Sequence, residues 1–245
     1  MTVDDPWETN AGWWRDAFTA GADPEYAEQI MPMVARHLAG AADVLDLGTG
    51  EGQVARLAAG PDVGARRVVG VDLAAAQLAN ARGQGGGPFY ARADAGSLPL
   101  RPASFDAVVA CLVLEHFEAA GRAIADAARV LRAGGRFLVF LNHPLTQAPG
   151  SGWIDDTILQ EQYWRVGRYL VEDTTTEEVD KGVLIPFVHR PLSFYVNAMA
   201  RAGLFIVEMQ EPAPPAGFLL QAEEYLEAAT IPRLMFLRAE KGTSP

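Results

Sequence analysis

Short hydrophobic runs alternate with amphipathic stretches through the middle of the chain. Five apolar runs occupy positions 44–48, 67–72, 88–94, 105–112 and 135–142. Each is bounded by Gly, Pro or Asp, and this pattern is typical of strands that are buried on both faces of a parallel sheet. Helical periodicity fills the intervals at 53–59, 74–82 and 119–131. The alternation predicts βαβ units in an open α/β sheet.

The flanking segments predict further helices and strands. Residues 23–38 fit a helix in which Asp23 is the N-cap and Pro24 takes the first position, while Pro32 predicts a kink inside it. Another helix is expected over 192–202. Two more strands are expected after it, within 203–212 and 232–240. They would bring the sheet to seven strands.

Two connections in the chain, before and after the fifth predicted strand, carry local turn or strand signals. The sequence "RAGG" at 132–135 predicts the end of a helix and a turn into the fifth strand. Further on, residues 162–173 and 181–191 flank the polar run Thr174–Asp180. We expect these two flanking segments to pair as an antiparallel hairpin inserted after the fifth strand.

Composition and charge narrow the classes of function. The 245 residues are 49% hydrophobic and 21% charged, which suits one domain with a lid. The formal net charge of −11 disfavours nucleic acid and anionic membranes as partners. The single cysteine, Cys111, excludes an internal disulfide and fits a reducing, cytoplasmic setting. No signal peptide and no apolar stretch of membrane-spanning length is apparent.

The strongest chemical signal is a glycine-rich turn after the first predicted strand, in "VLDLGTGEGQ" at 44–53. Glycines let the backbone approach a ligand closely, and the following helix offers free N–H groups. The second strand ends at Asp72, where an acidic residue can bind both hydroxyls of a ribose. The third leads to Asp94 and Ala95, which could bind an adenine edge. Three loops at one sheet edge therefore predict a nucleoside site.

The spacing of the glycines argues against a dinucleotide. Dinucleotide sites have Gly-x-Gly-x-x-Gly around a pyrophosphate, whereas this chain has Gly-x-Gly-x-Gly, with Asp46 two residues before the first glycine. A carboxylate so near the ligand favours a cationic or zwitterionic partner.

This pattern resembles motif I of the class I S-adenosylmethionine-dependent methyltransferases. The resemblance covers about residues 30–145. The segments "LDLGTGEG", "GVDLAAAQLANAR", "ADAGSLPLRPASFDAVVACLVLEHF" and "DAARVLRAGGRF" occur in the order and at the spacing of the family. The tail "HRPLSFYVNAMARAGLFIVEMQEP" is similar to bacterial small-molecule members near the ubiquinone and menaquinone methyltransferases.

The resemblance implies S-adenosyl-L-methionine as cofactor and S-adenosyl-L-homocysteine as product. The glycine loop would pack against the methionine moiety, and Asp72 would bind the ribose, with Leu73 against the adenine. Asp94 and Ala95 would hold the adenine edge. The backbone carbonyl of Leu112 would accept a hydrogen bond from the amino group of the cofactor. The expected cofactor-binding residues are Asp46, Gly48, Thr49, Gly50, Gly52, Asp72, Leu73, Asp94, Ala95 and Leu112.

The same resemblance implies a Rossmann-like three-layer sandwich. Its seven-stranded sheet is mostly parallel with an antiparallel last strand, which agrees with the seven predicted strands. The expected division is an N-terminal helical cap segment, an S-adenosylmethionine-binding core, a substrate-lid insert after the fifth strand, and a C-terminal part of the same sheet. These parts span residues 1–42, 43–142, 143–191 and 192–245.

The tryptophans indicate where the methyl acceptor would bind. All five lie outside residues 43–142, in the segments where this family builds its lid. Such rings line pockets for small organic ligands, so we expect a small, partly apolar acceptor. Trp7 is expected to be a packing residue instead. The candidate substrate-binding residues are Trp14, Trp153, Tyr163, Trp164 and His189.

Two histidines, His143 and His116, are the main candidates for a general base, because histidine titrates near neutrality. Further candidates are His189, which is expected rather to order the insert, Tyr163 and Tyr169. His143 directly follows the fifth strand, and Pro144 restricts its backbone to an extended form. We therefore expect the His143 ring at the acceptor end of the cleft. His116, just beyond the fourth strand, is the second candidate. An acceptor that is already an anion needs no base.

Several acceptor classes are disfavoured. The sequence "CLVLEHF" stands where enzymes that methylate DNA bases or glutamine carry Asn/Asp-Pro-Pro-aromatic, and no carboxylate cluster for magnesium follows the fourth strand. We expect metal-independent transfer to an O, N or C atom of a small molecule, by a chain that acts alone or as a homodimer. Two alternatives stay open: a cofactor-binding protein with other chemistry, and an NAD-type oxidoreductase.

Overall fold

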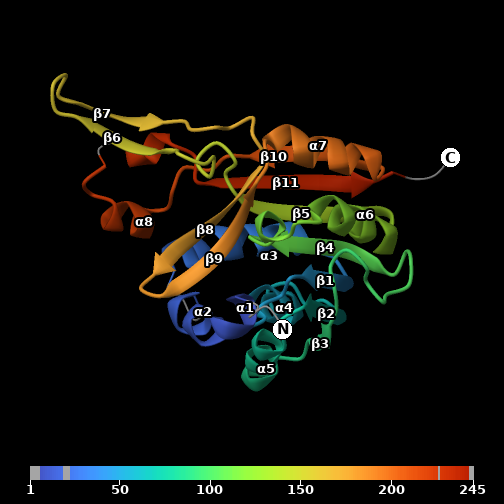
Figure 1. Cartoon of the computed structure of the whole chain (residues 1–245). Coiled ribbons are helices and arrows are strands. Elements are labelled where there is room, and N and C mark those ends of the chain that lie inside the picture. The colour runs from blue at the N-terminus through green and yellow to red at the C-terminus, as the bar shows by residue number, and fades with distance from the viewer. Residues whose placement is uncertain (1–5, 19–22, 226, 243–245) are drawn as a thin grey trace, which may run out of the picture.

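The computed structural model of the chain describes residues 6–18, 23–225 and 227–242. Within them, seven strands form one sheet in the order β10-β11-β5-β4-β1-β2-β3 (Figure 1). The strands are β1 (Asp43–Leu47), β2 (Arg67–Asp72), β3 (Phe89–Arg92), β4 (Phe105–Cys111), β5 (Leu131–Asn142), β10 (Leu204–Gln210) and β11 (Leu234–Lys241). Strand β11 is antiparallel to both of its neighbours, and the other adjacent pairs are parallel. The predicted Rossmann-like sheet with an antiparallel last strand is confirmed.

Helices cover both faces of this sheet. They are α3 (Met31–Leu38), α4 (Gln53–Ala59), α5 (Ala75–Gln84), α6 (Ala120–Val130) and α7 (Leu192–Arg201). Because side chains alternate along a strand, Val44 packs in the same cluster as α3 and α4. The next residue, Leu45, packs in the cluster of α6 and α7. This two-sided burial explains why the core strands read as continuous apolar runs.

The predicted helix over 23–38 forms, but it is not regular. The Oδ1 atom of Asp23 accepts hydrogen bonds from the backbone N–H groups of Glu25 (2.7 Å) and Tyr26 (3.2 Å), as an N-cap does. The segment η2 (Tyr26–Ile30) is a π-helix that leads into α3. Pro32 lies at the start of α3, where its ring crowds the preceding turn and it offers no N–H. The expected irregularity is therefore a π turn directly before this proline.

The turn predicted at 132–135 is present as an excursion within β5. The parallel register of β4 and β5 moves from Phe105 opposite Leu131 to Ala107 opposite Arg136. Residues 132–135 therefore pair with no residue of β4. Gly134 has a φ of 73°, a conformation that glycine adopts without strain.

The segment after β5 forms two hairpins rather than the one expected. β6 (Gly152–Asp156) pairs with β7 (Glu161–Arg165), and β8 (Asp173–Asp180) pairs with β9 (Val183–His189). The expected pairing of 162–173 with 181–191 is wrong, because the polar run is itself a strand. Its consecutive threonines favour extended backbone despite their polarity.

The two hairpins lie in different places. Figure 1 shows β8 and β9 crossing the molecule toward the short helices α1 (Pro6–Thr9) and α2 (Ala11–Phe18), and α1 contacts β9. The β6–β7 hairpin instead extends away from the sheet beside α8 (Ala216–Gln221). Positions 1–5 and 19–22 of the predicted N-terminal segment, and 243–245 of the predicted C-terminal part, lie outside the described residues.

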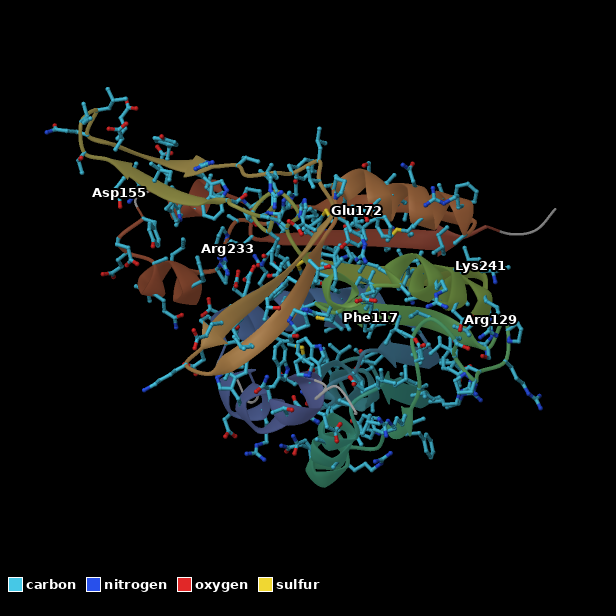
Figure 2. All side chains as sticks on the ribbon, in the orientation of Figure 1. Phe117, Arg129, Asp155, Glu172, Arg233 and Lys241 are labelled. Carbon is cyan, nitrogen blue, oxygen red and sulfur yellow. The ribbon has the colours of Figure 1, made fainter. Side chains whose placement is uncertain are left out.

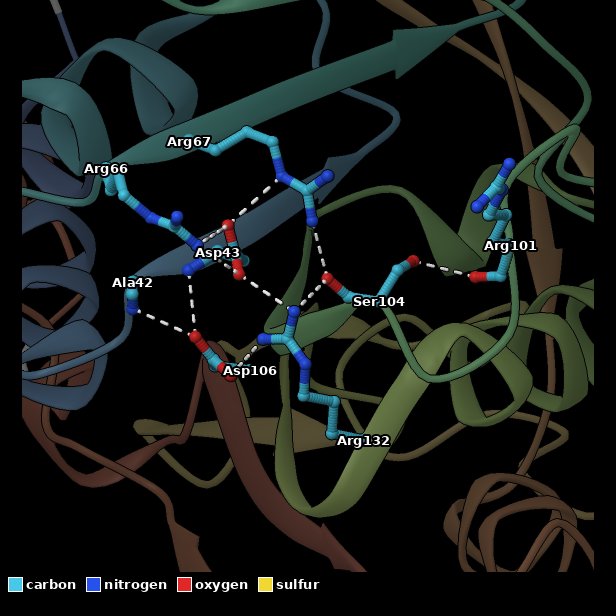
Figure 3. A network of polar contacts seen from close by, with 8 residues as sticks. All are labelled: Ala42, Asp43, Arg66, Arg67, Arg101, Ser104, Asp106 and Arg132. Atoms are coloured by element: carbon cyan, nitrogen blue, oxygen red, sulfur yellow. Dashed lines mark hydrogen bonds and ion pairs between the residues drawn. The ribbon is translucent and has the colours of Figure 1, made fainter.

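A cluster of ion pairs joins the strands at the edge of the sheet opposite their carboxyl ends (Figure 3). The buried Asp43 carboxylate accepts from Arg66 (3.1 Å), Arg67 (3.1 Å) and Arg132 (2.8 Å), and Arg132 also pairs with Asp106. Burial alone would raise the pKa of Asp43, but the bond from Arg132 and the neighbouring arginines hold it below the ordinary value. The cluster ties β1, β2, β4 and β5 together.

No helix within the described ranges is long and apolar enough to cross a bilayer.

Candidate active site

A cavity of about 480 Å³ opens where β1, β2 and β4 end. In an open α/β sheet the carboxyl edge is the expected place for a ligand. Nine of the ten predicted cofactor-binding residues line this cavity, which we call the first cavity. They are Asp46, Gly48, Thr49, Gly50, Asp72, Leu73, Asp94, Ala95 and Leu112. The sequence motifs, which are far apart along the chain, therefore meet at one site.

The remaining predicted residue, Gly52, has a different place. A Cβ atom on Gly52 would collide with the hydroxyl of Tyr90, and one on Gly48 would collide with Val113. Gly48, Gly50 and Gly52 also have φ values of 69°, 54° and 89°, which favour glycine. Gly48 and Gly50 bring the loop against the cavity, whereas Gly52 makes room for a side chain of β3.

Asp46 is buried at the end of β1 and receives a hydrogen bond of 2.5 Å from the Thr49 hydroxyl. Burial raises the pKa of Asp46 to about 7, although the bond from Thr49 works in the opposite direction. Near pH 7 the carboxyl group is therefore partly protonated and partly ionised. A cation beside it would favour the charged form.

Asp72 joins two loops of the first cavity. Its Oδ2 accepts from the N–H of Gly50 (2.8 Å), and its Oδ1 accepts from the N–H of Ala74 (2.9 Å). Asp72 thus fixes the glycine loop and the loop after β2 against each other at the wall of the first cavity. Each carboxylate oxygen can accept a second hydrogen bond.

The loops after β2, β3 and β4 provide apolar and polar surfaces. Leu73 lines the cavity with 55% of its surface exposed, an unusual position for leucine that fits contact with a flat ring. The Asp94 Oδ1 accepts from the N–H of Gly96 at 2.8 Å, which fixes this loop. Leu112 has a φ of 49°, a strained value for a residue other than glycine. Such strain is commonly found at functional sites.

Two buried acceptors beside the first cavity have no hydrogen-bond partner among the described residues. They are the Oε1 atoms of Glu51 and Gln77, and both residues line the cavity. The other oxygen of Glu51 binds Arg56 at 2.7 Å. An unpaired buried acceptor is costly, so these atoms indicate donors from a ligand. The amino groups and ribose hydroxyls of S-adenosylmethionine are such donors, and the residues present therefore fit this cofactor.

A second cavity of about 250 Å³ shares four lining residues with the first, namely Trp14, Tyr26, Leu112 and His116. Its far side is formed by the β8–β9 hairpin, through side chains that include Glu177 and Phe187. The second cavity thus lies between the N-terminal helices and that hairpin. It borders the first at the end of β4.

Only one predicted substrate-binding residue, Trp14, lines either cavity. Trp153 stacks on Tyr225 with ring centroids 5.2 Å apart, and it contacts Trp164 edge-on at 5.5 Å. Tyr163 belongs to the same β6–β7 hairpin. In Figure 2, Asp155 of this hairpin lies far from Phe117, which lines the first cavity.

His189 also lies outside both cavities. Its Nε2 bonds the carbonyl oxygen of Tyr169 at 2.8 Å. The neighbouring Arg190 is buried and donates to the carbonyl oxygens of Phe117 and Glu118, each at 2.8 Å. These residues therefore anchor the β8–β9 hairpin to the loop that follows β4.

Sequence reasoning missed several cavity residues. Trp7, expected to be packing, lines the first cavity and contacts the ring of His116 at 4.7 Å between centroids. Pro186 from β9 lines the same cavity, and Tyr26 from the π segment lines both. Pro32 predicted an irregular turn in this helix, and that turn is the π segment that contains Tyr26. Because π segments often occur at functional sites, the proline was an indirect signal for Tyr26. No local pattern identifies the contribution of β9.

His116 lines both cavities and is held in one orientation. Its Nδ1 donates to the carbonyl oxygen of Pro186 at 2.8 Å, and its ring packs against Phe187. Burial lowers the pKa of His116 to about 4, so the imidazole is neutral near pH 7. Its Nε2 can accept a hydrogen bond but is a weak base.

His143 does not line either cavity, whereas the sequence predicted its ring inside the cleft. Its Nε2 lies 2.7 Å from Glu211 Oε1, and its Nδ1 accepts from the N–H of Leu145 at 3.1 Å. The chain turns at Pro144 so that the ring packs toward the segment after β10 instead of the cavity.

In the ranges that the structure describes, no group of three or more His, Cys, Asp or Glu residues is placed to hold a metal ion. Metal independence remains a prediction.

Comparison with known proteins agrees with this site. A family model described as "Methyltransferase domain" matches residues 45–139. A Mycolicibacterium smegmatis protein named a probable S-adenosylmethionine-dependent methyltransferase is 40% identical over 128 residues, which are 50% of this chain and 46% of that protein. The chain therefore matches about half the length of this curated relative.

Solved structures extend the likeness to most of the chain. An S-adenosylmethionine-dependent methyltransferase from Mesorhizobium loti is 30% identical with a TM-score of 0.72, and the match covers 86% of this chain and 96% of that one. A Listeria monocytogenes protein has the same TM-score at 24% identity, covering 89% of this chain and 97% of that one, and supports the fold alone. The chain belongs to the class I S-adenosylmethionine-dependent methyltransferases.

Proposed function

We propose that this protein transfers a methyl group from S-adenosylmethionine to a small, partly apolar molecule without a metal ion. The observation that carries the proposal is the convergence of the predicted cofactor residues on the first cavity, beside a second cavity of suitable size for an acceptor. When bound, S-adenosylmethionine supplies an electrophilic methyl group on a sulfonium. The residues of the chain then have to bind, orient and shield the two reactants.

The first cavity would hold the cofactor through complementary groups. Asp72 would accept the ribose hydroxyls, and Leu73 would cover the adenine, whose edge Asp94 and Ala95 would bind. The unpaired Oε1 of Glu51 and the buried Asp46 carboxyl both lie on the glycine-loop side of this cavity. The Glu51 oxygen can accept a hydrogen bond from the ammonium group of the cofactor, and a sulfonium nearby would favour the charged form of Asp46.

The second cavity would hold the acceptor. The four residues shared by the two cavities mark the place where cofactor and acceptor would meet. The β8–β9 hairpin covers this place together with α1 and α2, so we propose that it is the lid. A lid excludes water around the sulfonium and keeps the nucleophile aligned.

Neither predicted histidine is arranged to act as a strong base. His143 lies outside both cavities and is bonded at both ring nitrogens. His116 lies at the junction, but burial lowers its pKa to about 4. We propose that His116 orients the acceptor by accepting a hydrogen bond at Nε2. Positioning then provides most of the catalysis, and the acceptor loses its proton to solvent or binds as the nucleophilic form.

The test is turnover with and without a chelator. Formation of S-adenosylhomocysteine is measured with a panel of small alcohols, amines and carbon acids, in the presence and absence of EDTA. At least one acceptor should give product at the same rate in EDTA. Restoration of a lost activity by magnesium would contradict metal independence, and cofactor binding without turnover on any acceptor would favour non-methyl-transfer chemistry.

A further inference from the structure

The second cavity combines aromatic rings with acidic side chains. Trp13, Trp14, Tyr26 and Phe187 contribute the rings. The charged lining residues are Asp23, Glu25, Glu177 and Arg233. The charge that a ligand would meet depends on which of these side chains are already paired within the protein.

Among the described residues, Arg233 is the one lining residue with a guanidinium or ammonium group, and it is already paired. The Nε of Arg233 lies 3.0 Å from Glu25 Oε1, and a second guanidinium nitrogen lies 3.1 Å from Glu25 Oε2. The same guanidinium also packs over the ring of Phe218 at 4.1 Å. This bidentate pair balances the charge of Arg233 with that of Glu25, so Arg233 adds no net positive charge to the second cavity.

Asp23 and Glu177 leave the second cavity negative. The Asp23 carboxylate caps the backbone N–H groups of Glu25 and Tyr26, which do not carry a full charge. Among the described residues, no hydrogen bond or ion pair reaches Glu177. His116, which also lines this cavity, is neutral near pH 7 and adds no positive charge.

Strand geometry aims Glu177 at the second cavity. Glu177 and Val179 of β8 both line the second cavity, and the register of β8 and β9 shifts just beyond Glu178. Ile185, opposite Glu177 in the register of β9, also lines the cavity. Glu177 is exposed, so it stands where the cavity opens to solvent. Glu178 belongs to the other face, where it accepts from the N–H of Gly182 at 2.7 Å.

We propose that the methyl acceptor carries a cationic group, a protonated amine or a quaternary ammonium, that is held by Glu177 and the aromatic rings of the second cavity. A separate O, N or C atom of the same molecule, which has a free electron pair, would receive the methyl group. Carboxylates and aromatic faces together are the usual means of recognising such cations. The net charge of −11 would draw the same class of ligand toward the site. This inference rests on the proposed function, because the second cavity is an acceptor site only if the cofactor occupies the first.

The test uses three probes with the same ring: 2-phenylethylamine, 2-phenylethanol and phenylacetate. Each is titrated calorimetrically into protein saturated with S-adenosylhomocysteine. The amine should bind at least about tenfold more tightly than the alcohol, as expected for a charged hydrogen bond. Phenylacetate should bind more weakly than both. Equal binding of the alcohol, tighter binding of phenylacetate, or no binding of the amine would overturn the proposal.

Two variants of β8 test whether Glu177 is the source of the preference for the amine. Glu177→Gln should reduce the preference for the amine several-fold and leave the affinity for the alcohol unchanged, because Asp23 and the aromatic rings remain. Glu178→Gln removes the same charge on the opposite face of β8 and should keep the preference. An unchanged preference in Glu177→Gln would overturn the proposal. Failure of S-adenosylhomocysteine itself to bind, measured first, would instead overturn the proposed function, so the two failures are distinguishable.

Discussion

At the residue scale, three aspartates on the central strands have different surroundings and different roles. Asp72 is held by two backbone N–H groups, Asp46 is buried beside a single hydroxyl, and Asp43 is surrounded by arginines at the opposite edge of the sheet. Sequence position predicted the first two as ligand residues, because each follows or ends a strand at the carboxyl edge. The Asp43 cluster was not predicted, since its partners come from distant parts of the chain.

Replacing Asp72 tests the proposed ribose contact. Asp72→Ala should weaken binding of S-adenosylhomocysteine by about 1–3 kcal/mol, the range for removing a charged hydrogen-bond partner. Calorimetry measures the change, and Asp62→Ala, an exposed aspartate away from both cavities, serves as the control. Unchanged affinity in a variant with a native circular dichroism spectrum would mean that Asp72 only fixes the loops.

The raised pKa of Asp46 makes a prediction about stability. In the folded protein this carboxyl has a pKa of about 7, above the value near 4 that an unfolded aspartate has. Folding therefore favours the protonated form, and the stability that Asp46 contributes is present below pH 4 and is lost as the pH rises through 7. Asp46→Asn cannot ionise. Its free energy of unfolding, relative to wild type, should increase by up to about 1.4 kcal/mol per pH unit between pH 5 and 7.

Urea unfolding of both proteins at pH 5, 6, 7 and 8 measures this difference. Taking the difference between the two proteins removes the contributions of the buried histidines, which are the same in both. A difference that does not change with pH would show that Asp46 is charged in the folded protein throughout this range.

His143 should contribute to stability more than to catalysis. His143→Ala removes the contact with Glu211 and leaves space in a buried position, so thermal or urea unfolding should show a loss of about 1–3 kcal/mol. Turnover per folded molecule should stay within a few-fold of wild type. A loss of turnover of about 10²–10⁴-fold without a loss of stability would restore His143 as the general base.

At the element scale, the central sheet followed from the sequence and the insert did not. Continuous apolar runs identify strands buried on two faces, and the intervening helices began within one or two residues of the expected positions. The polar strand β8 has no continuous apolar run, because most of its side chains are exposed at the surface. The tryptophans of β6 and β7 pack on each other and on Tyr225, which aromatic composition alone could not distinguish from a ligand pocket.

A pair of tryptophan variants tests which elements surround the acceptor. Trp14→Ala should raise the KM of the acceptor by about tenfold or more, because this ring lines both cavities. Trp153→Ala removes a ring of the same size from the β6–β7 hairpin and should leave KM within twofold. Steady-state kinetics at saturating cofactor measures both values. The reverse order would make the β6–β7 hairpin the lid.

At the scale of the whole molecule, the two edges of the sheet have separate tasks. Arginine–aspartate pairs join the strands at one edge (Figure 3), and the loops at the other edge surround the two cavities. The βαβ alternation predicted an open α/β sheet, and the resemblance to the methyltransferase family implied its Rossmann-like topology. The second cavity, which we propose as the acceptor site, could not be predicted, since it is assembled from the N-terminal helices, the end of β4 and a hairpin more than 60 residues further along the chain. The likeness to quinone-type members stays a prediction.

The central claim is that the first cavity binds S-adenosylmethionine and not a nicotinamide dinucleotide. Calorimetric titration of the wild-type protein with S-adenosylmethionine, S-adenosylhomocysteine and NAD tests it most directly. We expect one binding site per chain for each of the first two ligands and no measurable heat for NAD, because the glycine spacing and Asp46 do not suit a pyrophosphate. Tighter binding of NAD than of S-adenosylmethionine would contradict the account.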